Sequence, residues 1–303
     1  MRVVVAVGLL AFLLTRLHWQ TVLEHLDRMT TGIIVLVIAA YAVQLCVSSW
    51  KWQWALRIHG LRLHYAFLTR VYVIGFFLSN FLPTSIGGDA YRVYRTLPAT
   101  PPKSRAISAV LLERVVGLLA LLLLGLVGAL ALFGSTPLAR AYVVAAVAGT
   151  IALGAIVMFV RLPRARWLEP IHENLRTIAN ARGQWPPLIA ISLLFQVQAI
   201  LITFMLFNAV DAHVTLAQTA LIAAAAGIAA VIPFSINGLG IVEATFAGTA
   251  VAVGVSYEAG LLVALLVRTL VLPLTLLAGL LYAFEPAQTR DLSTPIPNVR
   301  SSG

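Results

Sequence analysis

Charged residues are scarce in this chain of 303 residues. They make up 11% of the sequence, and hydrophobic residues make up 60%. A soluble domain carries roughly 25% charged residues, so this chain has too few to cover a soluble surface. The mean hydropathy of +0.95 agrees. The composition therefore predicts an integral membrane protein.

Cysteine is nearly absent, and catalytic motifs are missing. Cys46 is the only cysteine, which excludes a disulfide framework and a thiolate metal site within one chain. The six histidines are scattered along the chain. We find no Walker loop, no G-x-S-x-G, no H-E-x-x-H and no paired-Asp motif of a metal-dependent transferase. We therefore expect no catalytic residue, no metal and no cofactor, and we do not expect an enzyme.

Acidic residues are fewer than basic residues, 11 against 21, which gives a net charge of +10. A basic soluble domain that could bind nucleic acid is absent. Most of the basic residues lie in short segments beside apolar runs, and Lys51, Arg57, Arg92 and Arg95 are assigned to cytoplasmic loops. This is the positive-inside pattern, and it predicts that both termini are cytoplasmic.

Long apolar runs are what the chain has instead. A helix satisfies its own backbone hydrogen bonds, and no ten-residue alternating strands occur, so we predict an all-α, polytopic membrane helical bundle. About six full spans are expected, over residues 3–19, 32–50, 109–133, 141–160, 188–210 and 260–284. Two further apolar segments, 67–82 and 216–232, are short and end in helix-breaking residues.

The two broken segments end in nearly identical motifs. Residues 82–88 read LPTSIGG and residues 232–238 read IPFSING, 150 residues further on. Paired breaks in two halves of a membrane protein are typical of a transporter site built from discontinuous helices. We interpret each broken segment as a re-entrant hairpin. Three crossings separate the two hairpins, which predicts inverted repeats.

The predicted organisation is one integral membrane domain over residues 1–285. The first repeat covers about 32–133, and the second covers about 188–284. A cytoplasmic linker, 161–187, contains an interfacial helix. A polar tail, 286–303, is expected to be disordered.

Ionisable residues inside apolar segments are costly and need a reason. Sliding the sequence by 154 residues pairs Asp89 with Glu243 and Arg114 with Arg268. Half-helices that start near Gly88 and Gly238 would direct positive dipole ends toward an anion, and arginine fits phosphate. The acidic residues would hold the arginines when the site is empty. Taken alone, each charge is equally consistent with a structural ion pair. The candidate substrate-binding residues are Asn80, Ser85, Gly87, Gly88, Asp89, Arg92, Glu113, Arg114, Ser235, Asn237, Gly238, Gly240, Glu243 and Arg268.

At these residues the chain resembles the transmembrane-region family of lysylphosphatidylglycerol synthases. The stretches that carry the resemblance are 80–83 with 87–89 and Arg92, the Glu113-Arg114 pair, and 232–240 with Glu243. The resemblance covers residues 5–285. It implies a membrane part that moves an aminoacylated phospholipid between leaflets. The soluble aminoacyl-transferase domain of bifunctional members would begin about where this chain ends, so lysine transfer is not expected.

Three functions follow as hypotheses. The first is a flippase in the bacterial inner membrane, which passes an anionic or aminoacylated phospholipid through a polar cavity between inverted repeats. The alternative is an enzyme or enzyme partner that acts on polyprenyl-linked sugars or lipids at the cytoplasmic face. The third is a membrane scaffold with structural buried charges. A phospholipid substrate is the expected partner, and a homo-oligomer and a separate soluble transferase are left open.

Overall fold

The computed structural model describes residues 29–81, 87–97, 104–159, 180–231 and 238–284, with the short pieces 15, 20, 174 and 176–178. Of residues 81 and 149–159 it describes the backbone alone. Several predictions lie outside the described residues: the first span, the motif residues 82–86 and 232–237, most of the linker, and the tail.

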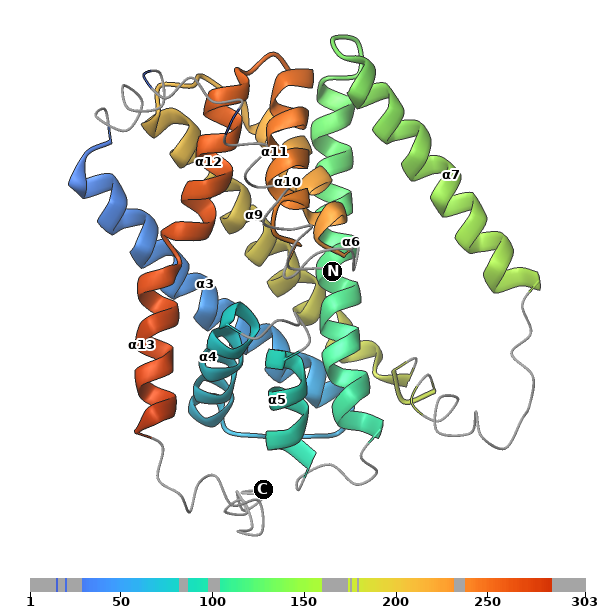
Figure 1. Ribbon diagram of the computed structural model, residues 1–303. Helices are drawn as coiled ribbons and strands as arrows, with labels where there is room; N and C mark the ends of the chain where they lie inside the picture. The colour runs from blue at the N-terminus through green and yellow to red at the C-terminus, as the bar shows by residue number, and fades with distance from the viewer. Residues whose placement is uncertain are drawn as a thin grey trace. The chain divides into compact units, whose positions relative to one another are not determined.

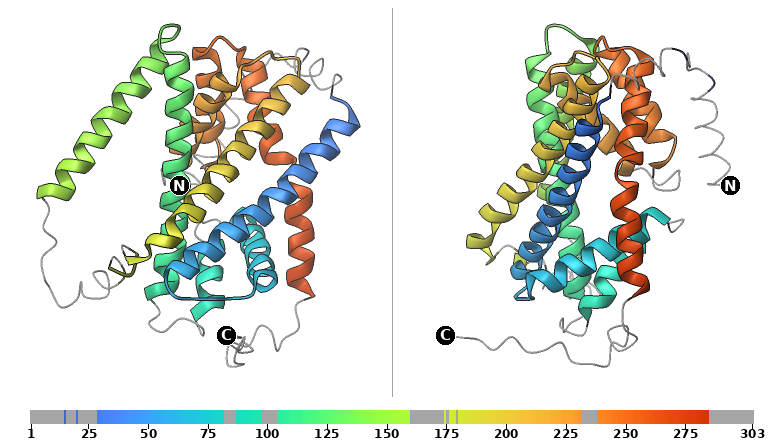
Figure 2. Two further views of the ribbon diagram at one scale, coloured as in Figure 1. Left: turned by 180° about the vertical axis from the view of Figure 1, so that it is seen from behind. Right: turned by 90° about the vertical axis from the view of Figure 1, so that its left-hand side faces the viewer.

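Every regular element in these residues is helical, which confirms the all-α prediction. The helices appear in Figure 1 and from two further sides in Figure 2. They are α3 (Thr31–Ile58), α4 (Tyr65–Phe81), α5 (Gly87–Thr96), α6 (Ser104–Ala131), α7 (Pro137–Phe159), the 3₁₀ helix η3 (Arg182–Gln184), α9 (Trp185–Ala209), α10 (Leu216–Val231), α11 (Ile241–Ala252), α12 (Tyr257–Thr269) and α13 (Leu272–Ala283).

Within the described residues, four helical segments are long and apolar enough to cross a membrane: Thr31–Ile58, Ser104–Ala131, Arg182–Ala209 and Tyr257–Ala283. A helix needs about 20 residues to span the hydrocarbon core. On α6 a stripe of apolar side chains at every fourth position is between 51% and 58% exposed, as lipid contact requires. The stripe consists of Leu111, Val115, Leu119, Leu123 and Val127.

One predicted span boundary was wrong, and one span contains an interruption. The second span was expected to end at Trp50, but α3 continues to Ile58, because the charge of Lys51 is buried against an acidic partner rather than solvated in a loop. The last predicted span, 260–284, matches the apolar segment Tyr257–Ala283, and its helix is interrupted between Thr269 and Leu272. Pro273 lacks the backbone N–H that a continuous helix would use, and it lies in the first turn of α13, where that donor is not needed.

Both predicted helix breaks are flanked by helices as expected. The first separates α4 from α5, and the second separates α10 from α11. In each case the two flanking helices pack against one another. Gly75 and Gly88 let α4 and α5 approach closely, since a Cβ atom on Gly88 would collide with the carbonyl oxygen of Gly75.

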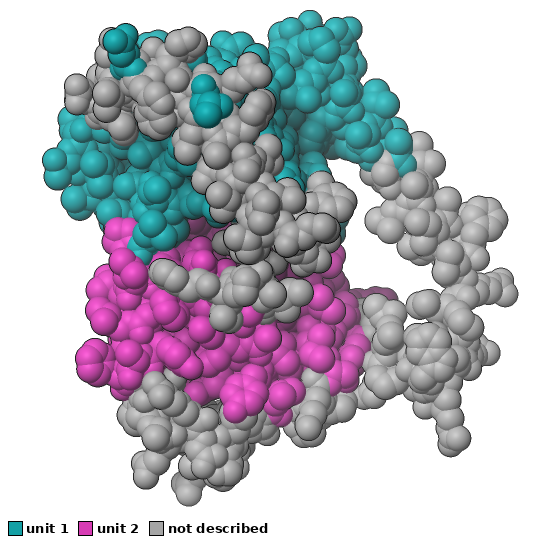
Figure 3. All heavy atoms as spheres, viewed as in Figure 1, with its two compact units in different colours: residues 1–41, 118–162, 196–272 teal, residues 42–117, 163–195, 273–303 magenta. Residues whose placement is uncertain are grey.

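The described residues fall into two compact units, which Figure 3 colours separately. Unit 1 comprises Met1–Tyr41, Leu118–Leu162 and Gln196–Leu272. Unit 2 comprises Ala42–Gly117, Pro163–Phe195 and Pro273–Gly303.

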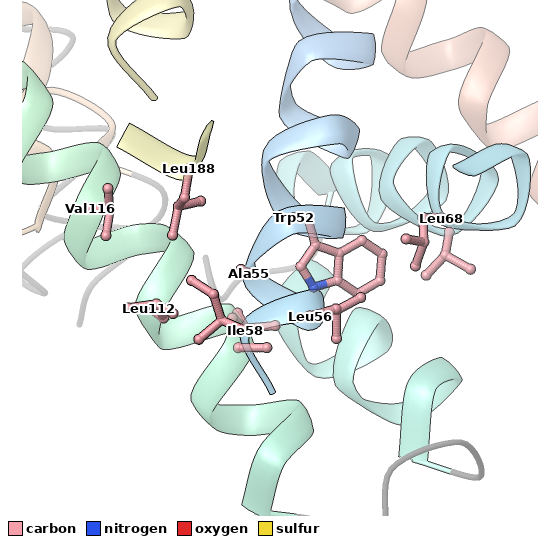
Figure 4. Close-up of a cluster of buried hydrophobic side chains, with 11 residues drawn as sticks. Trp52, Ala55, Leu56, Ile58, Leu68, Leu112, Val116 and Leu188 are labelled. Atoms are coloured by element: carbon pink, nitrogen blue, oxygen red, sulfur yellow. The ribbon is translucent and has the colours of Figure 1, made fainter. Parts of the chain in front are cut away.

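Unit 2 is held together by a hydrophobic cluster on which the charged site is built. Trp52, Ala55 and Leu56 on α3 meet Leu68 on α4 (Figure 4). The cluster also includes Leu112 and Val116 on α6 and Leu188 on α9. Burying a side chain of this size contributes roughly 1.5–3 kcal/mol. The cluster therefore fixes the side of α3 and α6 from which the neighbouring charged residues project.

Unit 1 is packed through small residues instead. Gly125 on α6 lies against Ala224 on α10, and Gly227 on α10 lies against Leu121. Gly260 on α12 lies against Ala247 on α11. Helices in a membrane gain little from the hydrophobic effect and rely on such close approach. The alanine-rich sequence of α10 therefore serves close packing.

Candidate functional site

A charged network lies inside unit 2, and Glu113 on α6 is at its centre. The Glu113 side chain is 2% exposed, and three groups reach its carboxylate. The Arg92 guanidinium donates to Oε2 at 2.5 Å, the Tyr72 hydroxyl donates to Oε1 at 3.4 Å, and the Lys51 ammonium lies 3.6 Å from Oε1. The network therefore joins α3, α4, α5 and α6 through a single carboxylate.

Asp89 extends the network toward the surface. Arg92 donates to its Oδ1 at 2.6 Å, and Arg114 forms an ion pair with its Oδ2. The Arg92 side chain is 6% exposed, whereas that of Arg114 is 55% exposed. Arg92 thus bridges the two carboxylates, and Arg114 is the member that solvent or a ligand meets first.

Aromatic rings form the walls around the buried cations. The Arg92 guanidinium lies 4.6 Å from the ring centroid of Tyr72 and 5.1 Å from that of Trp52. The Lys51 ammonium lies 4.6 Å from the centroid of Phe195. The negative face of an aromatic ring attracts a cation, most strongly where water is excluded. These rings stabilise positive charge that the carboxylates do not neutralise.

The network carries an excess of positive charge. Its ionisable members are three cations, Lys51, Arg92 and Arg114, against two carboxylates, Asp89 and Glu113, which gives a formal charge of +1. Lys51 and Arg92 balance Asp89 and Glu113 inside the protein, so the excess charge belongs to Arg114, whose side chain is 55% exposed. That charge is accessible to an anion.

Unit 1 contains a second buried ion pair. The Arg268 Nε donates to Oε1 of Glu243 at 2.6 Å, and the other carboxylate oxygen accepts from the backbone N–H of Gly240 at 2.6 Å. Glu243 is 1% exposed and lies in the first turn of α11, where a negative charge is favoured. One carboxylate thus caps α11 and ties it to α12.

The cap on α11 changes one expectation about the half-helices. We expected the helix that follows the second motif to direct a free N-terminus at an anion. The carboxylate of Glu243 occupies that N-terminus instead. Gly240 makes this possible because its φ of 84° lies in the left-handed region, and Gly238 has a φ of 72°.

The structure brings most of the predicted site residues into these two clusters. Asp89, Arg92, Glu113 and Arg114 meet in unit 2. Gly240, Glu243 and Arg268 meet in unit 1, with Gly238 nearby in sequence. Gly87 and Gly88 begin α5, and the Asn80 amide donates to the carbonyl of Phe76 within α4. Ser85, Ser235 and Asn237 lie outside the described residues.

The sequence analysis missed two members of the network and placed two helical arginines in a loop. Lys51 had been placed in a loop, and Tyr72 had not been singled out. Arg92 and Arg95 had also been assigned to a loop, but both lie on α5 and are buried. The signal for Lys51 was its position between Trp50 and Trp52, since apolar sequence continues beyond the lysine. Within the described residues, no three His, Cys, Asp or Glu side chains gather as a metal site would need.

Comparison with known proteins assigns the chain to a family. The family model described as lysylphosphatidylglycerol synthase TM region matches residues 1–279. No curated protein matches the chain.

Proposed function

This chain belongs to the lysylphosphatidylglycerol synthase transmembrane-region family and is a multi-pass membrane protein, and from that premise we propose that it moves a phospholipid between the membrane leaflets. The substrate would be an anionic or aminoacylated phospholipid. Its phosphate would be held by arginine side chains while its acyl chains stay in the bilayer.

The positive excess of the unit 2 network is the observation that carries this proposal. The two carboxylates balance Lys51 and Arg92, and the negative charge of one phosphodiester could match the remaining positive charge on the exposed Arg114. The planar guanidinium of arginine matches the geometry of phosphate oxygens, and both arginines of the network donate to a carboxylate that a phosphate could replace.

Ion-pair exchange gives the network a way to bind and release a headgroup. Arg114 is the exposed member, so a phosphate would meet it first and compete with Asp89 for it. Asp89 and Glu113 would hold the arginines while no substrate is bound. The same carboxylates could contact the ammonium of an aminoacylated headgroup. Neither state would leave an arginine buried without a counter-charge, which is the costly alternative.

The ion pair of unit 1 is proposed to serve the same cycle. It is electrically balanced, and Arg268 is 27% exposed whereas Glu243 is nearly inaccessible. A phosphate could therefore reach the arginine but not the carboxylate. The inverted orientation of the two repeats, the cytoplasmic position of both termini and the bacterial inner membrane remain parts of the proposal that rest on span count and charge distribution.

A lipid-scrambling assay tests the proposal. The purified chain is reconstituted into liposomes that contain fluorescent phosphatidylglycerol, and a membrane-impermeant reductant reports transfer to the outer leaflet. We expect faster loss of fluorescence than in protein-free vesicles. Transfer no faster than in empty vesicles, for phosphatidylglycerol and for its lysyl ester, would contradict the proposal.

Matched variants assign the activity to the network. Arg92→Gln and Arg268→Gln should each slow transfer by about tenfold or more, which corresponds to the loss of one charge-assisted phosphate contact. Arg140→Gln removes an exposed arginine at the start of α7 that belongs to neither cluster, so it is the control. Arg92→Lys keeps the charge and separates lost recognition from misfolding.

A further inference from the structure

A cavity of about 910 Å³ lies in unit 2, apart from the charged network, where α3 ends and α4 begins. A volume of this size suits a ligand as large as a lipid headgroup. Its wall is formed by the last turns of α3, the segment that leads into α4, and the 3₁₀ helix η3. The lining residues are Gln53, Trp54, Arg57, Gly60, Arg62, Leu63, His64, Tyr65, Gly183 and Gln184.

The chemistry of this wall is cationic and aromatic. Arg57, Arg62 and His64 line it, and among the described residues none of the lining side chains is acidic. The guanidinium of Arg57 lies 4.6 Å from the ring centroid of Trp54, which holds the arginine in place by a cation–π contact. Two arginines in the described wall favour an anion, and planar guanidinium groups favour a phosphate.

Two buried polar atoms in the wall lack a partner. Trp54 Nε1 and Gln184 Oε1 are inaccessible to solvent and make no hydrogen bond within the part of the chain that the structure describes. Buried donors and acceptors are nearly always paired, by protein, water or ligand.

An apolar groove continues from the cavity along α3. A second pocket of about 370 Å³ is lined by Val43, Cys46, Val47, Trp50, Gln53 and Tyr65. Gln53 and Tyr65 line both the cavity and the groove. From Val43 to Gln53 the helix advances ten residues, which is about 15 Å along its axis. Such a groove matches an extended acyl segment rather than a soluble metabolite.

We propose that the cavity and the groove together bind one anionic phospholipid. Its phosphate contacts Arg57 and Arg62, and one acyl chain follows α3 from Gln53 toward Val43. This site shares no residue with the charged network, and its occupation does not depend on whether the chain transports lipid. Tyr65 lies where the groove meets the cavity, and Trp50 lines the groove; aromatic residues of this kind are common at the headgroup level of a bilayer.

The single cysteine gives a direct test. Cys46 is exposed, and it lines the groove. An environment-sensitive fluorophore on Cys46 of the full chain in detergent micelles would be quenched by phosphatidylglycerol spin-labelled on an acyl chain. We expect saturable quenching by this lipid and much weaker quenching by spin-labelled phosphatidylcholine, which has no net charge.

The variant Arg57→Gln with Arg62→Gln should weaken phosphatidylglycerol binding by about tenfold or more, because two charges near the headgroup are lost. Arg140→Gln, on an exposed position of α7, should leave binding unchanged. Ionic strength can be varied with the native chain itself, so this test does not depend on the folding of a variant. Higher ionic strength should weaken binding, since partly exposed charges are screened.

Three outcomes would overturn the proposal. Equal quenching by both lipids would show only the lipid that surrounds any membrane protein. Displacement of phosphatidylglycerol by glycerol phosphate at similar concentration would show a site for a free phosphate without an acyl contribution. Binding that neither salt nor the double variant weakens would show that the arginines do not recognise the headgroup. The scrambling assay is read independently, so failure there leaves this binding result intact.

Discussion

Arg268 Nε lies 2.6 Å from Oε1 of Glu243, and 25 residues separate the two in sequence. Asp89 and Arg114 form an ion pair across the same separation, since 114 minus 89 is also 25. In both pairs the carboxylate lies in the first turn of the helix that follows a break, and the arginine lies on the next helix. One ion-pair arrangement therefore occurs in each unit, at the offset of 154 residues that the sequence suggested.

Glu113→Gln should be among the most destabilising conservative changes in unit 2. It leaves Lys51 and Arg92 buried beside one fewer carboxylate, and removing one partner of a buried ion pair costs about 3–5 kcal/mol. Thermal unfolding in micelles, followed by tryptophan fluorescence, measures the loss. Asp211→Asn is the control, because the Asp211 carboxylate is exposed, lies 3.7 Å from the exposed His213 ring, and should contribute at most about 1 kcal/mol. Equal losses of stability in the two variants would show that the buried network contributes no more to stability than an exposed pair.

The ion pair of unit 1 should show strong coupling in a double-mutant cycle. Glu243→Gln leaves Arg268 without its counter-charge, and Arg268→Gln leaves a carboxylate that is 1% exposed. The double variant removes both charges, so it should lose less stability than the two single variants together, with a coupling energy of about 1–3 kcal/mol. The same unfolding assay measures it. Additive effects would mean that the pair contributes little beyond two independent side chains.

Gly240→Ala should lower the free energy of unfolding, whereas Gly248→Ala should leave it unchanged or raise it. Gly240 adopts a φ of 84°, which costs a residue with a Cβ atom roughly 1–2 kcal/mol. Gly248 lies inside α11, and nothing lies within 4 Å of the position its Cβ would take. Alanine there should be neutral or stabilise the helix by up to about 1 kcal/mol. Comparable losses in both variants would show that the backbone at Gly240 is not constrained.

Gly88→Ala should push α4 and α5 apart and lower the stability of the protein. The added Cβ would meet the carbonyl oxygen of Gly75 and the hydroxyl of Ser79, and overpacking of this kind typically costs 1–3 kcal/mol. Because α5 carries Asp89 and Arg92, we also expect slower lipid transfer in the scrambling assay. Gly134→Ala is the matched control, since no atom lies within 4 Å of its Cβ position. Unchanged stability of Gly88→Ala would contradict the close approach of the two helices.

His59 should make stability depend on pH. It follows the last residue of α3, and its Nδ1 lies 2.9 Å from the carbonyl oxygen of Ala55. That oxygen can only accept, so Nδ1 carries the proton, and the neutral Nε2 accepts from the Ser108 hydroxyl at 2.8 Å. Burial, with the nearby positive charge of Arg105, lowers the pKa of His59 below its usual 6.5.

The direction of this pH effect follows from the lowered pKa. The unfolded chain takes up the proton of this histidine at a higher pH than the folded chain does. The stability that neutral His59 contributes is therefore present above pH 6.5 and lost as the pH falls toward the folded-state pKa. Melting temperatures of the native chain and of His59→Gln, compared at pH 7.5 and 5.5, check this. A native chain whose melting temperature falls no more than that of the variant would contradict the prediction.

The sequence was informative about the acidic and basic partners because charge is so rare in it. In a chain with 11% charged residues, a carboxylate and an arginine inside apolar helices have few alternatives to one another. This is why the acidic residues could be expected to hold the arginines, although the individual partners, Arg92 with Glu113 and Arg268 with Glu243, came only from the structure. Lys51 was missed because an isolated lysine after an apolar run looks the same whether it ends a helix in water or projects into a buried network.

By itself the sequence determined the helical membrane class, the positions of both helix breaks and the identity of most charged residues near them. Hydrophobic run length, proline and glycine act locally, so they can be recognised along the chain. Only the tertiary structure decided that α3 runs past Lys51, that Glu243 caps α11, and that three cations in unit 2 share two carboxylates. These features depend on which helix faces meet, and that is set by packing between segments far apart in the sequence.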